Sequence, residues 1–293
     1  MSEECTHDCS NCGAACSSRD AAPQHDAPNP NSSVKKVIGV VSGKGGVGKT
    51  VTAINLADIL VRDYKKRVLL ADCDGQCNLT DFFFPALDEG LSVAEVLTGT
   101  CEPLWSDNIM PIRDGLDLLP GSEDLYTLDL QALLYGSDYG ARYRMRDFIN
   151  AVQTDGEVDY LIFDCAPGYT CATVAALMSS DDVVIPVTVD GFSFRGLETM
   201  ARQISGLRRN GLPAKVAGVL ITQWRNTDVV AQADALLRQG EIPVFMTPIR
   251  RTDKVPESTF ERVPLEAYSP RSAAGRDYRM WVEEYLGGEL HGV

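Results

Sequence analysis

Residues 41–50 read VSGKGGVGKT, and this short stretch decides the fold. From Gly43 to Thr50 it follows the pattern G-x-x-x-x-G-K-[ST] of a phosphate-binding loop. A β-branched run, VKKVIGVVS, precedes the loop at 34–42, and a helical pattern, TVTAINLADILVRDY, follows it at 50–64. Because the loop binds phosphate where a strand passes into a helix, this order predicts a nucleotide-binding α/β domain.

The chemistry of the loop assigns roles to its residues. Glycines let consecutive backbone N–H groups converge on phosphate oxygens, and the helix that follows adds the positive end of its dipole. We expect Lys49 to reach the β- and γ-phosphates of ATP and the Thr50 hydroxyl to bind Mg²⁺. The expected nucleotide-binding residues are Gly43, Lys44, Gly45, Gly46, Val47, Gly48, Lys49, Thr50 and Val51.

Strand and helix patterns alternate along the rest of the chain. Apolar runs predict further strands at 67–74, 115–122, 159–168, 181–189, 214–222 and 242–249. Helical patterns predict helices at 142–152, 172–178, 195–208, 229–239 and 271–286. Since most of the strands are apolar on both faces, we predict the α/β class, with a doubly wound, mostly parallel sheet covered by helices on both faces.

Phosphoryl transfer also needs a metal held in place and a water held in line. The segment LIFDCAPG puts Asp164 at the carboxyl end of an apolar strand, the edge where open α/β sheets bind ligands. We expect Asp164 to act on Mg²⁺, with a helix-capping aspartate as the alternative. Two further acids, Asp72 and Asp74, end the strand in LLADCDGQCNLT. The alternative for Asp74 is a turn residue before a glycine.

Several of these segments carry a family resemblance. KGGVGKT resembles the deviant phosphate loop of the ParA/MinD superfamily, and the whole of 35–286 is most similar to its ParA/Soj-type members. LLADCDGQCNLT resembles their D-x-D-P-Q-G-N segment, except that Gly75 replaces the proline and Cys77 the glycine. The C-terminal stretch resembles theirs in Glu257, Pro264 and the Y-x-P-x-S segment at 268–272.

The resemblance implies a dimerising ATPase. It implies that Lys44 reaches across to the nucleotide of a second copy, that Asp72 supports the Mg²⁺ shell, and that Asp74 orients or deprotonates the attacking water. It further implies a homodimer with ATP, non-specific DNA binding by that dimer, and a ParB-like DNA-binding adaptor that stimulates hydrolysis. The activity would serve DNA partitioning or positioning. The candidate DNA-binding residues are Arg225, Arg250, Arg251 and Lys254.

Charge is unevenly distributed. The chain of 293 residues has a formal net charge of −14, which opposes attraction to polyanions over the whole surface. Between Arg195 and Arg279, however, 14 Lys and Arg stand against 9 Asp and Glu. A DNA contact would therefore use this C-terminal third, although a solvated surface role is the alternative for each single basic residue.

The first 33 residues look separate from the ATPase domain at 34–293. They contain Cys5, Cys9, Cys12 and Cys16, followed by a Pro-, Ser- and Asn-rich stretch that we interpret as a disordered linker. The four thiols predict either a Zn²⁺ or iron–sulfur site or a flexible reduced tail. Because this leader resembles the start of Mrp-type scaffold proteins, the alternative function is an ATP-dependent iron–sulfur carrier.

The sequence also bears on location. The N-terminus is acidic and has no apolar core of a signal peptide, and no long apolar segment is present, so we expect a cytoplasmic protein. The ParA resemblance further implies that it associates with the nucleoid. A MinD-like regulator at the membrane is a third possibility. We expect no membrane binding, since the C-terminal WVEEYLGGELHGV is acidic rather than basic and amphipathic.

Overall fold

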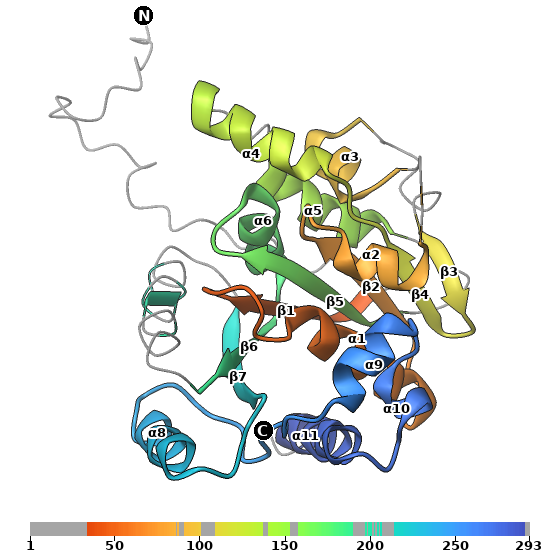
Figure 1. Cartoon of the computed structure of the whole chain (residues 1–293). Coiled ribbons are helices and arrows are strands. Elements are labelled where there is room, and N and C mark those ends of the chain that lie inside the picture. The colour runs from red at the N-terminus through yellow and green to blue at the C-terminus, as the bar shows by residue number, and fades with distance from the viewer. Residues whose placement is uncertain are drawn as a thin grey trace, which may run out of the picture.

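A computed structural model provides the structure of the chain (Figure 1). It describes residues 34–290 except 86, 88–90, 101–108, 137–139, 153–157, 190–196, 198, 201, 203, 205 and 207–213. The predicted leader, at 1–33, lies outside these residues, and so does most of the helix expected at 195–208.

A single sheet of seven strands, in the order β3-β4-β2-β5-β1-β6-β7, forms the centre of the described chain. All neighbouring pairs are parallel except β3 with β4. The strands are β1 (Val34–Ser42), β2 (Val68–Cys73), β3 (Met110–Arg113), β4 (Leu116–Leu119), β5 (Val158–Pro167), β6 (Asp182–Thr188) and β7 (Lys215–Thr222). The predicted fold class, a mostly parallel sheet, is confirmed.

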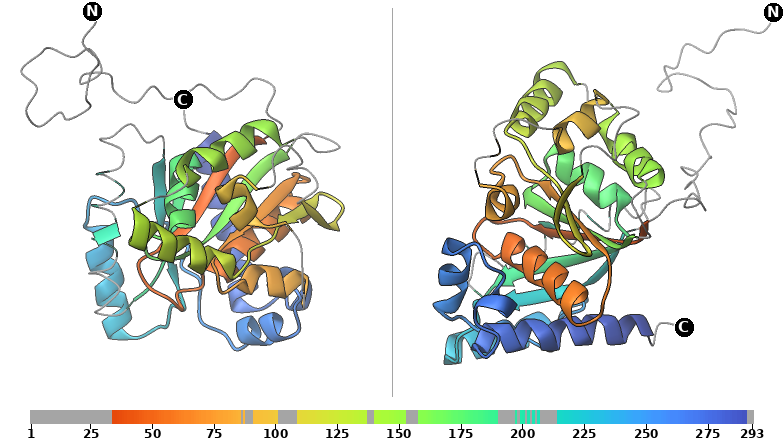
Figure 2. Two further views of the ribbon diagram at one scale, coloured as in Figure 1. Left: turned by 90° about the horizontal axis from the view of Figure 1, so that it is seen from above. Right: turned by 90° about the vertical axis from the view of Figure 1, so that its right-hand side faces the viewer.

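Helices cover both faces of this sheet, as Figures 1 and 2 show. On one face lie α3 (Val93–Thr98), α4 (Asp124–Tyr135), α5 (Ala141–Ala151) and α6 (Cys171–Ser179). On the other lie α1 (Lys49–Arg62), α2 (Asn78–Phe83), α10 (Leu265–Tyr268) and α11 (Ala273–Leu290). The remaining helices are α8 (Asp228–Arg238), which follows β7, and α9 (Lys254–Phe260), which precedes α10.

Each central strand contributes to two hydrophobic cores because its side chains point alternately to opposite faces. In β2, Leu69 and Ala71 join the core under α3–α6, whereas Val68 and Leu70 join the core under α1 and α11. All six residues of β2 are buried. This double burial explains the continuous apolar runs in the sequence.

The prediction of a strand at 242–249 is wrong. This segment forms an isolated bridge, in which Val244 pairs with Val219 of β7, and no continuous strand. The Phe245 and Ile249 N–H groups donate to the Val219 and Ile221 carbonyls, at 3.0 and 2.8 Å. Its two prolines, at 243 and 248, have no N–H to donate to a neighbouring strand. The backbone N–H groups of Met246 and Thr247 instead donate to the Glu284 carboxylate of α11, at 2.6 and 3.0 Å.

Among the helices that the structure describes, none combines the length and the apolar character needed to cross a bilayer.

Candidate functional site

The phosphate-binding loop joins β1 to α1, as the sequence predicts. Gly46 and Gly48 adopt φ angles of +76° and +85°, a left-handed conformation that L side chains rarely adopt. A Cβ on Gly45, Gly46 or Gly48 would meet no atom within 4 Å, so these glycines border open space. Helix α1 begins at Lys49, directly after the turn, and its first backbone N–H groups are available to an anion.

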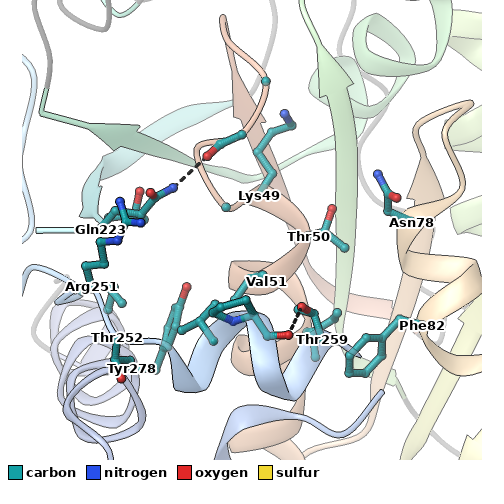
Figure 3. Close-up of a pocket in the computed structure, with 18 of the residues that line it drawn as sticks. Lys49, Thr50, Val51, Asn78, Phe82, Gln223, Arg251, Thr252, Thr259 and Tyr278 are labelled. Atoms are coloured by element: carbon teal, nitrogen blue, oxygen red, sulfur yellow. Dashed lines mark hydrogen bonds between the residues drawn. The ribbon is translucent and has the colours of Figure 1, made fainter. Parts of the chain in front are cut away.

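The end of β7 fixes the shape of this loop. The Thr222 hydroxyl donates to the carbonyl oxygens of Val47 and Val187, at 2.8 and 3.1 Å. The Gln223 amide donates to the Gly46 carbonyl at 2.8 Å, a contact drawn in Figure 3. Sequence reasoning missed both positioning residues. Thr222 ends the predicted strand, and Gln223, the next residue, adopts a φ of +53°. These bonds hold the carbonyls of Gly46 and Val47 toward β7, so that the backbone N–H groups of the loop can point toward a phosphate.

A cavity of about 760 Å³ opens beside the loop. It is lined by Lys49, Thr50 and Val51 of α1 and by Arg251, Thr252 and Thr259 from the segment after β7, and Figure 3 labels all six. Asp74, Asn78 and Phe82 border it near α2, and Tyr278 of α11 completes the wall. The volume and the mixture of apolar and polar lining suit a ligand of nucleotide size.

Asp164 and Asp72 lie opposite each other, because the two are paired in the register of β5 with β2. Asp164 is 1% exposed, and its Oδ1 has no hydrogen-bond partner among the described residues. Burial raises the pKa of the Asp164 carboxyl and the Asp72 carboxylate raises it further, while the Thr50 hydroxyl and the Lys49 ammonium lower it. A buried carboxylate oxygen without a partner, beside a hydroxyl and a second acid, fits the chemistry of a cation site.

The oxygens of Asp72 are occupied by protein donors. Its Oδ2 accepts from the backbone N–H and the hydroxyl of Thr80, at 2.9 and 2.7 Å, and its Oδ1 accepts from the Asp74 N–H at 3.2 Å. Burial raises the pKa of Asp72, and these hydrogen bonds lower it in part. We infer that Asp72 acts on a metal indirectly, by adding negative charge and by holding the loop that carries Asp74.

Asp74 borders the cavity, where a water-orienting acid would have to be. Its Oδ1 accepts from the Gln76 N–H at 3.0 Å in a tight turn. The two departures from the D-x-D-P-Q-G-N pattern fit this turn. A Cβ on Gly75 would lie 2.9 Å from the Tyr126 ring, so the small residue admits that ring. Cys77 takes the left-handed conformation, with φ +53°, that the glycine of the pattern would adopt without strain.

The residues around Asp164 fit a bound Mg²⁺ ion. The Thr50 hydroxyl and the free oxygen of Asp164 would hold the ion directly or through water. No cluster of three or more His, Cys, Asp or Glu side chains suited to a metal occurs in the described ranges. A site with few protein ligands suits Mg²⁺, which keeps several waters and binds substrate phosphates, whose charge it offsets.

The two lysines of the loop lie in different environments. Lys49 is 7% exposed and lines the cavity, as predicted for a residue that binds phosphate of its own nucleotide. Lys44 is exposed and does not line this cavity. It borders a second pocket of about 330 Å³, together with Arg225, Thr188 and Val230.

The four predicted DNA-binding residues are all exposed, but they are not one cluster of equivalent cations. Arg225 lies beside Lys44 at the second pocket, and Arg251 lines the nucleotide cavity. Lys254 forms an ion pair with Glu257, 2.5 Å from Nζ to Oε2. Arg250 also borders the cavity, and its guanidinium is held by the buried carboxylate of Asp277.

The pair of Arg250 and Asp277 fixes one wall of the cavity. Asp277 accepts from the Arg250 backbone N–H at 2.9 Å, from Nε at 2.8 Å and from Nη2 at 2.6 Å. Because α11 carries Asp277, the C-terminal helix anchors the segment that follows 242–249. Sequence reasoning could not find Asp277, since nothing in its local pattern distinguishes it from a solvated helix residue.

The cysteines divide between two regions. Cys5, Cys9, Cys12 and Cys16, the candidate Zn²⁺ or iron–sulfur ligands, lie outside the described residues, as does Cys101. Cys73 and Cys165 are buried in the core, as expected for packing residues, and Cys171 is partly buried. The comparisons with known proteins lend no support to a metal at the leader.

The family model described as an AAA domain (AAA_31) matches residues 35–215. A ParA family protein of Chlamydia pneumoniae is 33% identical over 86% of this chain and 97% of its own length. The chromosome partitioning protein ParA of Caulobacter vibrioides is 28% identical, over 87% and 95%.

Among solved structures, the cobyrinic acid a,c-diamide synthase of Mycobacterium smegmatis with bound ADP and magnesium is 28% identical. The match covers 88% of this chain and 97% of that one, with a TM-score of 0.71. A structure of the same synthase with a bound ATP analog and magnesium matches this chain equally well, with 28% identity and a TM-score of 0.72. Relatives of this similarity, matched along nearly their full length, together with the phosphate loop and its acids, show that the chain is an ATPase that belongs to the ParA family.

Proposed function

We propose that ATP causes two copies of this chain to pair, that the pair binds DNA non-specifically, and that a DNA-bound adaptor protein stimulates hydrolysis and ends the pairing. The activity would partition or position DNA, with the protein associated with the nucleoid. In this cycle Lys44 of each copy contacts the phosphates of the nucleotide held by the other. A charge supplied across an interface makes hydrolysis depend on assembly, as an arginine finger does.

The different placement of the two lysines carries this proposal. Lys49 is buried and lines the cavity, where it would supply one cation to the phosphates of a bound nucleotide. Lys44 belongs to the same loop yet is exposed at a pocket outside that cavity. A second copy packed against this surface would bring its own triphosphate toward Lys44, whereas the nucleotide of the same copy lies beside Lys49.

The test compares Lys44→Ala with Lys49→Ala. With ATP and Mg²⁺, we expect the unmodified chain to sediment as a dimer and Lys44→Ala as a monomer that still binds ATP. Lys49→Ala should lose turnover and bind ATP at least about tenfold more weakly, because it removes a buried cation from the phosphates. A Lys44→Ala variant that pairs normally with ATP would refute the cross-interface role.

Asp74→Ala separates pairing from hydrolysis. If Asp74 orients or deprotonates the attacking water, this variant should bind ATP, form the dimer and retain it without turnover. Dimers that dissociate as quickly as those of the unmodified chain in the presence of ATP would show that Asp74 has another role.

DNA binding is tested on residues outside the nucleotide cavity. Arg225→Ala with Lys254→Ala should weaken retention of duplex DNA in a gel shift and reduce its salt dependence, while Mg²⁺-dependent turnover continues. Arg250 and Arg251 are less suitable targets because both line the cavity and Arg250 is bound to Asp277. Unchanged retention at low and high salt would exclude Arg225 and Lys254 from the DNA interface.

A further inference from the structure

Helix α4 exposes an apolar face. Leu130, Leu133 and Leu134 are 54%, 82% and 63% exposed, and Tyr126 is 46% exposed. Their spacing, i, i+4, i+7 and i+8, puts all four on one side of the helix. The opposite side, with Leu125 and Leu128, is buried in the core. In Figure 1 the helix lies at the periphery of the molecule, extending past α6.

A helix that is apolar on both sides is normally buried on both sides. Four large apolar side chains gathered on one exposed face form the kind of patch that marks a protein-binding site. The charge around this patch is of one sign. From 123 to 136 the sequence contains Glu123, Asp124 and Asp129 and no Lys or Arg. A partner with apolar residues on one face and basic residues beside them would complement both properties.

The same helix contacts the turn that holds the proposed water-orienting acid. The Gln76 side-chain amide donates to the Tyr126 hydroxyl. The Gln76 backbone N–H donates to Asp74 Oδ1 at 3.0 Å. The Tyr126 ring packs against Gly75, which lies between Asp74 and Gln76 in the chain, so closely that a side chain at Gly75 would not fit. Tyr126 therefore joins the exposed face of α4 to the Asp74 turn through a single residue.

A second hydrogen bond connects α4 to the start of α6. The Asp129 Oδ1 accepts from the Cys171 backbone N–H at 2.7 Å, at the start of α6. Helix α6 follows β5, the strand that carries Asp164. A displacement of α4 would thus act on the turn that carries Asp74 and on the connection between β5, which carries Asp164, and α6.

We propose that the face formed by Tyr126, Leu130, Leu133 and Leu134 binds a cationic amphipathic helix of a partner protein, and that this contact alters ATP hydrolysis through Tyr126 and Gln76. The inference deepens the proposed function, since it assigns a surface and a chemistry to the stimulating partner. A second copy of this chain is a poorer occupant, because two copies of α4 would bring their carboxylates together without a basic residue on either helix.

The binding test uses a synthetic helical peptide of about 18 residues, long enough for five turns. Its leucines lie on one face and its lysines on the other. A peptide of the same composition with the leucines distributed around the helix, and one with glutamate for lysine, serve as controls. Binding to the full-length protein in ADP is measured by fluorescence anisotropy. We compare Leu134→Glu on α4 with Leu236→Glu on α8, which have almost equal exposure of 63% and 61%.

We expect the cationic peptide to bind the unmodified chain and Leu236→Glu alike, and to bind Leu134→Glu at least about tenfold more weakly, the loss typical of an interface anchor. Neither control peptide should match it. Equal binding to both variants, equal binding of the glutamate peptide, or no binding would overturn the proposal. A control asks whether the chain pairs with itself through this face. Sedimentation in ADP without peptide should show the unmodified chain and Leu134→Glu in the same oligomeric state. A dimer that Leu134→Glu abolishes would identify a second copy as the occupant and overturn the proposal.

The coupling is tested with Tyr126→Phe, which removes only the hydroxyl. The peptide should bind this variant with unchanged affinity but change its ATP turnover less than that of the unmodified chain. If the peptide changed the turnover of Tyr126→Phe and of the unmodified chain equally, the proposed coupling through the Tyr126 hydroxyl would be wrong. The binding result does not depend on the proposed function, because Lys44→Ala in ADP should bind the peptide normally even if ATP-dependent pairing or DNA binding fails to appear.

Discussion

Asp72 and Asp164 occupy paired positions on two adjacent parallel strands, yet their carboxylates have different surroundings. Asp72 accepts hydrogen bonds on both oxygens, whereas Asp164 has one buried oxygen with no partner in the part of the chain that the structure describes. Two buried acids at one sheet edge repel each other, and a divalent cation would relieve that repulsion. From this difference in hydrogen bonding we propose that Asp164 binds the ion and that Asp72 supports the turn.

Asp164→Asn tests the magnesium assignment. The amide keeps the shape of the carboxyl but lacks its charge, so we expect Mg²⁺ to strengthen ATP binding by this variant at least about tenfold less than in the unmodified chain. Calorimetric titration with ATP, with and without Mg²⁺, measures the effect. The fold in the absence of ligand should be retained, because the substitution removes a buried charge. An undiminished Mg²⁺ effect would place the ion elsewhere.

Asp72→Ala tests the structural role of its partner. The change leaves the Thr80 N–H and hydroxyl and the Asp74 N–H without their acceptor, while it relieves the repulsion with Asp164. We expect the lost acceptor to prevail and the free energy of unfolding to fall by about 2 kcal/mol, since buried donors are left without partners. Urea denaturation measures this. A stability equal to that of the unmodified chain would mean that water replaces the carboxylate.

Cys77→Gly should relieve strain in the Asp74 turn. A left-handed conformation costs an L residue about 1–2 kcal/mol, more than the entropy that a glycine loses on folding, so we expect a small gain of about 0.5 kcal/mol. Cys77→Ala is the control, because it removes the thiol and retains the strain. Thermal unfolding of the two variants side by side gives the comparison. If alanine stabilises as much as glycine, the thiol and not the backbone is responsible.

Asp277→Ala should release the cavity wall that Arg250 holds. Because the carboxylate is buried and the guanidinium is partly exposed, we expect a loss of about 2 kcal/mol in the free energy of unfolding. The Michaelis constant for ATP should rise as the wall loosens. Glu284→Ala is the matched control. Glu284 is also on α11 and accepts from backbone N–H groups, but its partners, Met246 and Thr247, do not line the cavity, whereas Arg250 does. Equal kinetic effects of the two variants would mean that α11 acts only on overall stability.

Local pattern was sufficient for much of the architecture. The strands around Asp72 and Asp164 are recognisable because a doubly covered parallel sheet requires continuous apolar runs. The segment at 242–249 is equally apolar, yet it forms only an isolated bridge and no continuous ladder, because its prolines cannot donate and the N–H groups of Met246 and Thr247 bind Glu284. Helix α4 was missed because leucines occur on both of its sides and produce no clear helical periodicity.

By itself, the sequence determined the phosphate loop, the sheet and the identity of the acids, because each depends on residues close together in the chain. Only the tertiary structure decided which of those residues are buried, which are exposed and which side chains hold them in place. Thr222, Gln223 and Asp277 shape the site from positions far along the chain, and their contacts exist only after the strands and α11 have packed. The exposure of Lys44 and of the α4 leucines is likewise a property of packing, since the same residue types are buried wherever a neighbouring element covers them.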